Sequence, residues 1–406
     1  MMATWFLIII YLAFISLGIP DSLFGAAWPV MWPELGAAFG SAGIVSMVVA
    51  GGTIVSSLAS GTIIEKIGTG KITLMSCFLT AGALLGFSFA PSLFWLVLLA
   101  IPLGLGGGAV DAALNQYVAT HYKAHHMSWL HCFWGVGATM GPIIMSFYIS
   151  NYNSWRSGYT AVSMIQWGLV IILLITLPLW KRVNAIQDSI ISEAQSDYSQ
   201  MDHNIARGEN TPKQNLIRMK GVKNTLVAFL FYCGVEATVG LWGASFLVGA
   251  RNIPAETAAG WVSLYYGGIT VGRLITGFVT LKINNRILIR IGQLTAVAGG
   301  LILLLPLPVV FLLPGFILIG LGLAPIYPGL LHETPTRFGK ENSAKLMGYQ
   351  MAVAYTGTTL LPPIVGLIAS QVSIHFFPVA VLVFLLFMLL SSEQVNRILK
   401  KRILKG

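Results

Sequence analysis

Three acidic residues stand out because each lies deep inside a long apolar stretch: Asp21, Asp111 and Glu236. In a poorly hydrated cavity, desolvation disfavours the carboxylate anion, so such a group can load and release protons near physiological pH. Protonation also neutralises the carboxyl group, so the group can pass into a less polar environment without carrying an unpaired charge. We therefore predict that these carboxyl groups exchange protons. Asp111 is expected to be the coupling site, and Asp21 a proton carrier or an acceptor for solute hydroxyls.

Two of these acids have polar residues at informative positions. Asn115 follows Asp111 by four residues and therefore shares its face of a helix. An amide one turn from a carboxyl group suits a sugar hydroxyl, which both donates and accepts hydrogen bonds. The alternative is an Asp–Asn pair satisfied by neighbouring helices. Glu236 also has two interpretations, a binding role or a structural pair with Arg273 or a backbone group, and Arg273 is expected to act as a gate or to extend its charge to the membrane surface.

Other polar and aromatic side chains occur inside apolar stretches that can line a cavity. Aromatic rings stack on the apolar face of a pyranose, and amides bind its hydroxyl groups, so this mixture suits a sugar as well as many other neutral organic molecules. The alternative for each residue is ordinary helix packing. The predicted solute-binding residues are Asn115, Gln166, Trp242, Tyr265, Tyr266, Gln350 and Tyr355.

The composition places these residues in a membrane. Of the 406 residues, 56% are hydrophobic and 9% are charged, and the mean hydropathy is +0.78. This excludes a soluble enzyme, because so apolar a chain has too little polar surface to cover itself in water. About 20 apolar residues form one membrane-spanning helix, and the chain is long enough for a dozen such helices. Apolar segments are predicted at 4–33, 41–64, 72–90, 93–120, 126–150, 158–180, 223–250, 257–281, 286–305, 308–332, 345–370 and 373–392.

The distribution of basic residues predicts the orientation of these segments. Of the 24 Lys and Arg residues, 21 lie in alternate loops, in the polar segment 181–222, in the tail after residue 392 or in the first five residues of an apolar segment that follows one of these loops. Basic residues are retained on the cytoplasmic side during insertion, so both termini and the 181–222 linker are expected to be cytoplasmic, and a bacterial cytoplasmic membrane is the expected location. The net charge of +10 is explained in this way, and no nucleic-acid partner is expected.

The chain also contains an internal repeat with an offset near 215 residues. Asp21 and Gly25 match Glu236 and Gly240, and the segment 103–106 (Leu-Gly-Leu-Gly) matches 319–322 (Ile-Gly-Leu-Gly). Because the matches occur in the same order, they predict two parallel six-helix halves with a solute site between them near mid-membrane, and access that alternates by rocking. The expected division is 1–180 for the first bundle, 181–222 for the linker, 223–392 for the second bundle and 393–406 for a basic tail.

One loop carries a recognisable motif. Residues 61–71 read Gly-Thr-Ile-Ile-Glu-Lys-Ile-Gly-Thr-Gly-Lys, which resembles the Gly-x-x-x-Asp-Arg-x-Gly-Arg-Arg/Lys signature of the major facilitator superfamily. Gly61 is expected to allow close helix contact, Glu65 to pair with a cation or a helix N-terminus, and Lys66 and Lys71 to hold the loop at the membrane surface. The alternative is a generic basic turn. The signature and gating residues are thus Gly61, Glu65, Lys66, Gly68, Lys71 and Arg273.

Finer motifs have a narrower resemblance. The stretch 110–116 (Val-Asp-Ala-Ala-Leu-Asn-Gln) is similar to the Leu-Glu-Thr-Ala-Ala-Asn-Pro stretch of fucose-permease-like sugar:proton symporters, with Asp111 in the place of the acid. Asp21 occupies the first-helix position at which that family also carries a buried aspartate. Tyr232, Gly234 and Glu236, together with the stretches 325–328 and 334–339, look like the seventh- and tenth-helix segments of that family.

The resemblance implies an all-α membrane protein with twelve helices in two pseudo-symmetric six-helix bundles. The expected function is proton-coupled uptake of a small neutral solute, with a monosaccharide favoured, by a monomer that contacts membrane lipids. No metal or organic cofactor is expected, since the proton is the coupling ion. The alternative is a proton-driven antiporter that exports drugs or metabolites, to which Gly135, Gly137 and Gly141 point because a glycine-rich fifth helix is often linked to antiporters. A membrane receptor or lipid scramblase is the third alternative.

Overall fold

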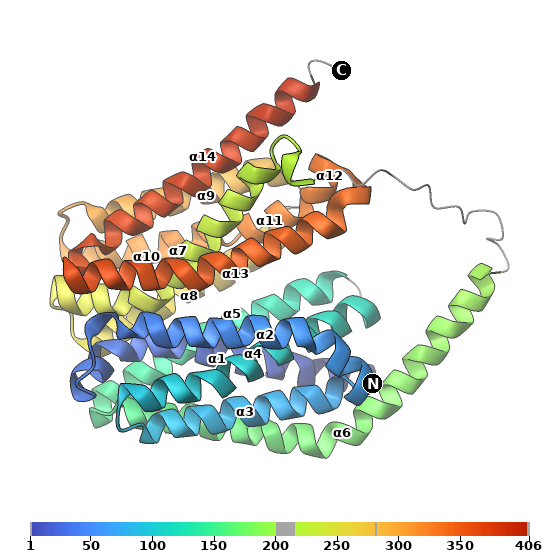
Figure 1. The fold of residues 1–406 in the computed structure, drawn as a ribbon, viewed down its shortest axis with the longest axis horizontal. Helices are drawn as coiled ribbons and strands as arrows, with labels where there is room; N and C mark the ends of the chain where they lie inside the picture. Colours follow the sequence, from blue (N-terminus) through green and yellow to red (C-terminus); the bar gives the residue numbers. More distant parts are fainter. Residues whose placement is uncertain (1, 123, 200–215, 281, 404–406) are drawn as a thin grey trace.

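The computed structural model describes residues 2–122, 124–199, 216–280 and 282–403, and every regular element in these ranges is helical (Figure 1). The first half comprises α1 (Met2–Glu34), α2 (Ala42–Ile67), α3 (Thr69–Phe89), α4 (Leu93–His121), α5 (Ala124–Tyr152) and α6 (Trp155–Ser199). The second half comprises α7 (Val222–Arg251), α8 (Ala255–Val279), α9 (Asn285–Leu304), α10 (Leu312–Leu323), α11 (Ile326–His332), α12 (Thr334–Phe338), α13 (Lys340–Gln371) and α14 (Phe377–Ile403). Short 3₁₀ turns occupy η1 (Phe39–Ser41), η2 (Leu216–Arg218), η3 (Val309–Phe311) and η4 (Ile374–Phe376).

The described part of the chain contains eleven helical segments that are long and apolar enough to cross a membrane. The helix α8 is not among them, although its 25 residues pack inside the bundle against α5 and α10. Its glycines, its tyrosines and Arg273 lower its mean hydropathy. The protein is therefore an all-helical, multi-pass membrane protein, as the composition predicts.

The structure departs from three of the predicted segments, the sixth, the tenth and the last. The tenth segment is broken into α10 and α11, because Pro325 and Pro328 lack the amide protons that would continue the helix. The sixth helix continues from the predicted end at 180 to Ser199, so the first part of the predicted linker is helical, whereas residues 200–215 lie outside the described residues. The last helix continues from the predicted end at 392 to Ile403, so most of the predicted tail is part of α14.

The sequence repeat is also a repeat of helix contacts. A side chain at Gly104 would collide with the Val49 carbonyl group where α4 crosses α2, and a side chain at Gly320 would collide with the Tyr265 carbonyl group where α10 crosses α8. These two contacts are related by an offset of 216 residues. Each half thus uses the same close backbone crossing, which only glycine permits.

The two halves contact one another at one end of the molecule. We call the end at which α6 leaves the bundle the linker end, and the opposite end the far end. At the far end Ser146 donates a hydrogen bond of 2.7 Å to the Glu256 carbonyl oxygen, and Phe39 stacks on Trp242 with ring centroids 5.2 Å apart. At the linker end the halves are splayed (Figure 1). The structure is therefore closed at the far end and open at the linker end.

The first helices of the two halves cross at the repeated glycines. A side chain at Gly25 of α1 would collide with the carbonyl oxygen of Gly240 in α7. Asp21 and Glu236 each lie one helical turn before this crossing, on the side of the linker end. The repeat therefore brings the two acids to related positions directly beneath the point at which the halves touch.

Candidate functional site

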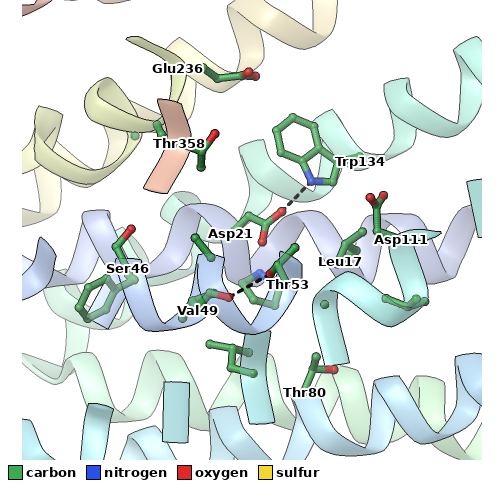
Figure 2. Close-up of a pocket in the computed structure, with 18 of the residues that line it drawn as sticks. Leu17, Asp21, Ser46, Val49, Thr53, Thr80, Asp111, Trp134, Glu236 and Thr358 are labelled. Carbon is green, nitrogen blue, oxygen red and sulfur yellow. Dashed lines mark hydrogen bonds between the residues drawn. The ribbon is translucent and has the colours of Figure 1, made fainter. Parts of the chain in front are cut away.

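A cavity of about 410 Å³ lies between the two halves and is lined by residues of both. Asp21, Asp111 and Glu236 all line it, together with Arg273. Figure 2 shows the three carboxyl groups around this opening, with Trp134 beside Asp21. The structure thus brings together the three acids that were selected from the sequence, although they lie on α1, α4 and α7.

Asp21 projects from a helix that is interrupted by Pro20. Pro20 has no amide proton, so the Ser16 carbonyl group loses its partner within α1. The side chain of Gln166 in α6 donates a hydrogen bond to this carbonyl oxygen and accepts one from the Ser16 hydroxyl at 2.7 Å. Gln166 is 1% exposed and is not among the residues that line the cavity. Its observed contacts therefore support α1 next to Asp21 and do not reach the cavity.

The carboxyl group of Asp21 accepts a hydrogen bond of 2.8 Å from the indole nitrogen of Trp134 (Figure 2). The guanidinium group of Arg273 lies over the same indole, 5.3 Å from the ring centroid. Arg273 also forms an ion pair of 3.3 Å with Glu236. A continuous series of contacts therefore runs across the cavity from Asp21 to Glu236. Of the two interpretations of Glu236, a binding role or a structural pair, the described state contains the pair with Arg273.

Asp111 has a neutral partner on its own helix. The side-chain amide of Asn115 donates hydrogen bonds of 2.9 Å to the Asp111 carboxylate and to its backbone carbonyl group. Asp111 lines the cavity, whereas Asn115 is not among the lining residues. In the described state Asn115 thus orients the acid.

The other predicted solute-binding residues divide into two groups. Tyr266 and Tyr355 line the cavity. Trp242 is fully buried and donates to the Pro362 carbonyl oxygen at 2.8 Å, and the Tyr265 hydroxyl donates to the Glu236 carbonyl oxygen at 3.2 Å. Gln350 bonds to Thr334 at 2.9 Å. In the described state the hydrogen bonds of these three side chains lie within the second half, and none of the three lines the cavity. Trp242 also stacks on Phe39 of the first half.

The signature loop lies at the linker end, where Gly68 adopts a φ of 83° between α2 and α3. Glu65 and Lys66 are exposed there, as is Lys71. A Cβ atom at Gly61 would meet no atom within 4 Å, so the expected close helix contact at this glycine is absent from the described state. The reason is geometric: α2 meets α13 at the far end, where Gly43 abuts Pro363, and Gly61 lies where the halves are apart.

Trp134 was not selected from the sequence, although it contacts two of the predicted residues. Trp134 lies inside the fifth apolar segment, eight residues after its predicted start at 126, whereas membrane tryptophans are enriched at segment ends. Its distance from the segment end is a signal in the sequence that favours a role other than anchoring at the membrane interface. Tyr159 and Tyr327 also line the cavity, but nothing in their spacing distinguishes them from packing residues.

The contacts of the fifth-helix glycines are also defined. A side chain at Gly137 would collide with the Ile15 carbonyl group in α1, and one at Gly135 would collide with the Thr270 hydroxyl in α8. Gly135 and Gly137 therefore permit close packing of α5 against α8 and α1 in the described state.

Comparison with known proteins agrees with this architecture. A family model described as Major Facilitator Superfamily matches residues 10–331 and, in an overlapping match, residues 225–398. The chain belongs to this superfamily. It is therefore a membrane transporter of a small molecule and not an enzyme, whereas the matches do not determine its subfamily.

The relatives of this superfamily member are distant. It is 22% identical over 317 residues to "Bypass of stop codon protein 6" of Saccharomyces cerevisiae, covering 71% of this chain and 62% of that protein. It is 21% identical over 197 residues to the "Glucose/mannose transporter GlcP" of Bacillus subtilis, covering 47% of this chain and 45% of that protein. The chain thus spans less than two thirds of either relative. The solved structure of the nucleoside transporter NupG is similar in fold, with a TM-score of 0.69 and 14% identity over 96% of this chain and 98% of that one.

Proposed function

We propose that this transporter couples the uptake of a small neutral solute, with a monosaccharide favoured, to the movement of protons. The observation that carries the proposal is the unequal pairing of the three cavity acids. Glu236 has a cationic partner in Arg273, whereas the hydrogen-bond donors to Asp21 and Asp111 are the neutral side chains of Trp134 and Asn115. Two carboxyl groups in a shared cavity without a cation at hydrogen-bond distance are suited to bind and release protons.

Protonation would reduce the net negative charge of the cavity that the two halves enclose when they rock. When Asp21 and Asp111 are ionised, the four charged groups of the cavity sum to minus two, and each bound proton reduces that charge by one. Enclosing a neutral cavity costs less free energy than enclosing unpaired carboxylates, so the proton-loaded carrier closes more readily around its solute. Asp111 is the proposed coupling site, and Asp21 carries the second proton or accepts a solute hydroxyl.

The lining of the cavity favours a neutral solute. Among the described lining residues the single permanent cation is Arg273, and it is already paired with Glu236, so a negatively charged solute would compete with that carboxylate. Tyr266 and Tyr355 present aromatic faces and hydroxyl groups to the same space, which suits the apolar face and the hydroxyl groups of a pyranose. The name of the distant relative GlcP, a glucose/mannose transporter, agrees with this choice.

The orientation follows from the positive-inside rule. We propose that the linker end and both termini face the cytoplasm, in a bacterial cytoplasmic membrane, because the basic loops gather at that end. The described state would then be open to the cytoplasm. A monomer would suffice for transport, since the two halves of one chain enclose the cavity.

The proposal is tested with purified protein in proteoliposomes, by recording external pH while monosaccharides and polyols are added one at a time. We expect alkalinisation outside on addition of one sugar, and loss of this signal in Asp111→Asn, while exchange of labelled sugar continues. Exchange is the internal control, since it requires binding and rocking but no net proton movement. Full driven uptake in Asp111→Asn would refute the coupling role.

A second panel of amphipathic cations distinguishes export from uptake. The proposed uptake function predicts no proton release with these compounds. Solute-induced proton release with a cation, together with silence across the sugars, would instead establish the proton-driven antiporter.

A further inference from the structure

Trp134 makes two different contacts with its indole ring. Its N–H group donates to the Asp21 carboxylate at 2.8 Å, and its face lies 5.3 Å from the guanidinium carbon of Arg273. Asp21 and Trp134 belong to the first half, on α1 and α5, whereas Arg273 belongs to α8 of the second half. The indole therefore connects a titratable group in one half to a permanent cation in the other.

Both contacts stabilise the ionised form of Asp21. A hydrogen bond to a carboxylate is roughly twice as strong as one to a neutral acceptor. The indole face carries partial negative charge and attracts Arg273, which brings a positive charge to within 5.3 Å of the ring centroid. Protonation of Asp21 replaces the charged acceptor by a neutral one and thereby weakens the first contact. The indole then loses the interaction that holds it in place beneath Arg273.

The contact between Trp134 and Arg273 depends on how the two halves are placed. Near this contact α5 and α8 are in close contact, since a side chain at Gly135 would collide with the Thr270 hydroxyl. Rocking moves α5 and α8 relative to one another, so the placement of Arg273 over the indole belongs to the described state, which is open at the linker end. A group that is stabilised as an anion in one state releases its proton in that state, and by reciprocity the release favours the state.

We infer that Trp134 is a positioning residue that makes the state open at the linker end the proton-releasing state, by presenting its N–H group to Asp21 while its ring holds Arg273. This inference rests on the proposed function, in which Asp21 binds a transported proton. It adds a direction to that function: the contacts of Trp134 with Asp21 and Arg273 favour proton release towards the linker end, and the loss of these contacts favours closure of that end.

Other titratable or charged groups face Asp21 within the same cavity and must be considered in any test. They come from eight helices that border the cavity, and the test below separates their contributions by substituting Asp21 itself. They are Cys77 on α3, Asp111 on α4, His131 on α5, Tyr159 on α6, Cys233 and Glu236 on α7, Tyr266 and Arg273 on α8, Tyr327 on α11 and Tyr355 on α13.

The experiment measures the opening of the linker end as a function of pH. Spin labels are attached at Lys71→Cys and Lys282→Cys, which are exposed positions of the two halves, after the three native cysteines have been replaced by alanine. The distance distribution between the labels is recorded in lipid nanodiscs across a pH series. We expect the open population to grow as pH rises and to lose its pH dependence in Asp21→Asn.

The decisive variant is Trp134→Phe, which retains an aromatic face and removes the N–H group. The Asp21 anion loses a donor in this variant, so protonation begins at higher pH and the midpoint of opening rises, by about one unit for a tenfold loss of anion stability. The matched control is Trp95→Phe, at a tryptophan that is 46% exposed on α4, and it should leave the midpoint unchanged.

A second variant keeps the inference testable if Trp134→Phe does not fold. Trp134→Leu removes the N–H group and the aromatic face together and leaves every charged group of the cavity in place, so it should also raise the midpoint. An unchanged midpoint in the folded variants would overturn the role of Trp134. A pH response that persists in Asp21→Asn would instead show that Asp21 is not the titrating group. A distance between the labels that does not change with pH in the unsubstituted protein would overturn both the role of Trp134 and the role of Asp21.

Discussion

Arg273 and Glu236 form the one ion pair among the described residues that line the cavity. The two side chains are 16% and 19% exposed, so water screens them only in part. We predict that Arg273→Gln lowers the free energy of unfolding by about 3 kcal/mol, at the lower end of the range for buried pairs because both residues border the cavity. Thermal unfolding in detergent measures this loss.

The double variant Glu236→Gln with Arg273→Gln is the control for this prediction. It leaves no uncompensated charge, so we expect it to regain most of the stability that Arg273→Gln loses. If the double variant is as unstable as the single one, the loss comes from packing of the arginine and the ion pair contributes little.

Sequence reasoning found the acids of the site more readily than their partners. A carboxyl group inside an apolar helix has few explanations, and for this reason Asp21, Asp111 and Glu236 could be selected and are found in one cavity. A glutamine or tryptophan inside an apolar helix has more possible explanations, including ordinary packing. Gln166 instead completes the hydrogen bonding that Pro20 interrupts, and this use depends on a neighbouring helix that sequence spacing does not identify.

At the scale of the helices, the crossing of α1 and α5 sets the position of Trp134 beside Asp21. Side chains at Gly18 and Gly137 would each collide with a backbone carbonyl group of the other helix. We predict that Gly137→Ala pushes the helices apart and lowers the free energy of unfolding by about 2 kcal/mol. Proton-coupled uptake should fall with it, since the distance from Trp134 to Asp21 depends on the same crossing.

The control is Gly168→Ala in α6, where an added Cβ atom would meet nothing within 4 Å. Alanine is favoured over glycine inside a helix, so this variant should be neutral or slightly stabilising. Unfolding temperature and uptake are measured for both variants. An equal effect of the two would show that the crossing of α1 and α5 tolerates a methyl group.

The helices were predictable to different degrees. Long apolar segments predicted the spans within a few residues, because burial in lipid requires a continuous apolar stretch. Pro325, by contrast, breaks the tenth segment into α10 and α11, and a proline inside an apolar run does not by itself tell a kink from a break. The apolar pattern marks the end of the sixth span near residue 180, whereas α6 continues to Ser199, because polar residues extend the helix there without an apolar stretch to mark its end.

At the scale of the whole molecule, the two ends differ in a way that the repeat does not predict. The repeat predicts two equivalent halves, and in the structure their first helices cross at the matching glycines Gly25 and Gly240. It cannot select which end is closed, because both closures use the same pseudo-symmetric helices and differ only by rocking. The described state resolves this choice through contacts such as that between Ser146 and Glu256.

A covalent link across the far end tests whether transport requires that end to open. A Cβ atom at Gly260 of α8 would lie 3.7 Å from the Ser146 hydroxyl oxygen of α5, which is close enough for cysteines at these positions to form a disulfide with little backbone movement. We predict that Ser146→Cys with Gly260→Cys, in a background without native cysteines, loses transport on oxidation in proportion to the cross-linked fraction and regains it on reduction. Entry of a label from the linker end should continue, because that end stays open. Each single cysteine variant should transport solute under both conditions, and transport by the fully cross-linked protein would contradict alternating access through the far end.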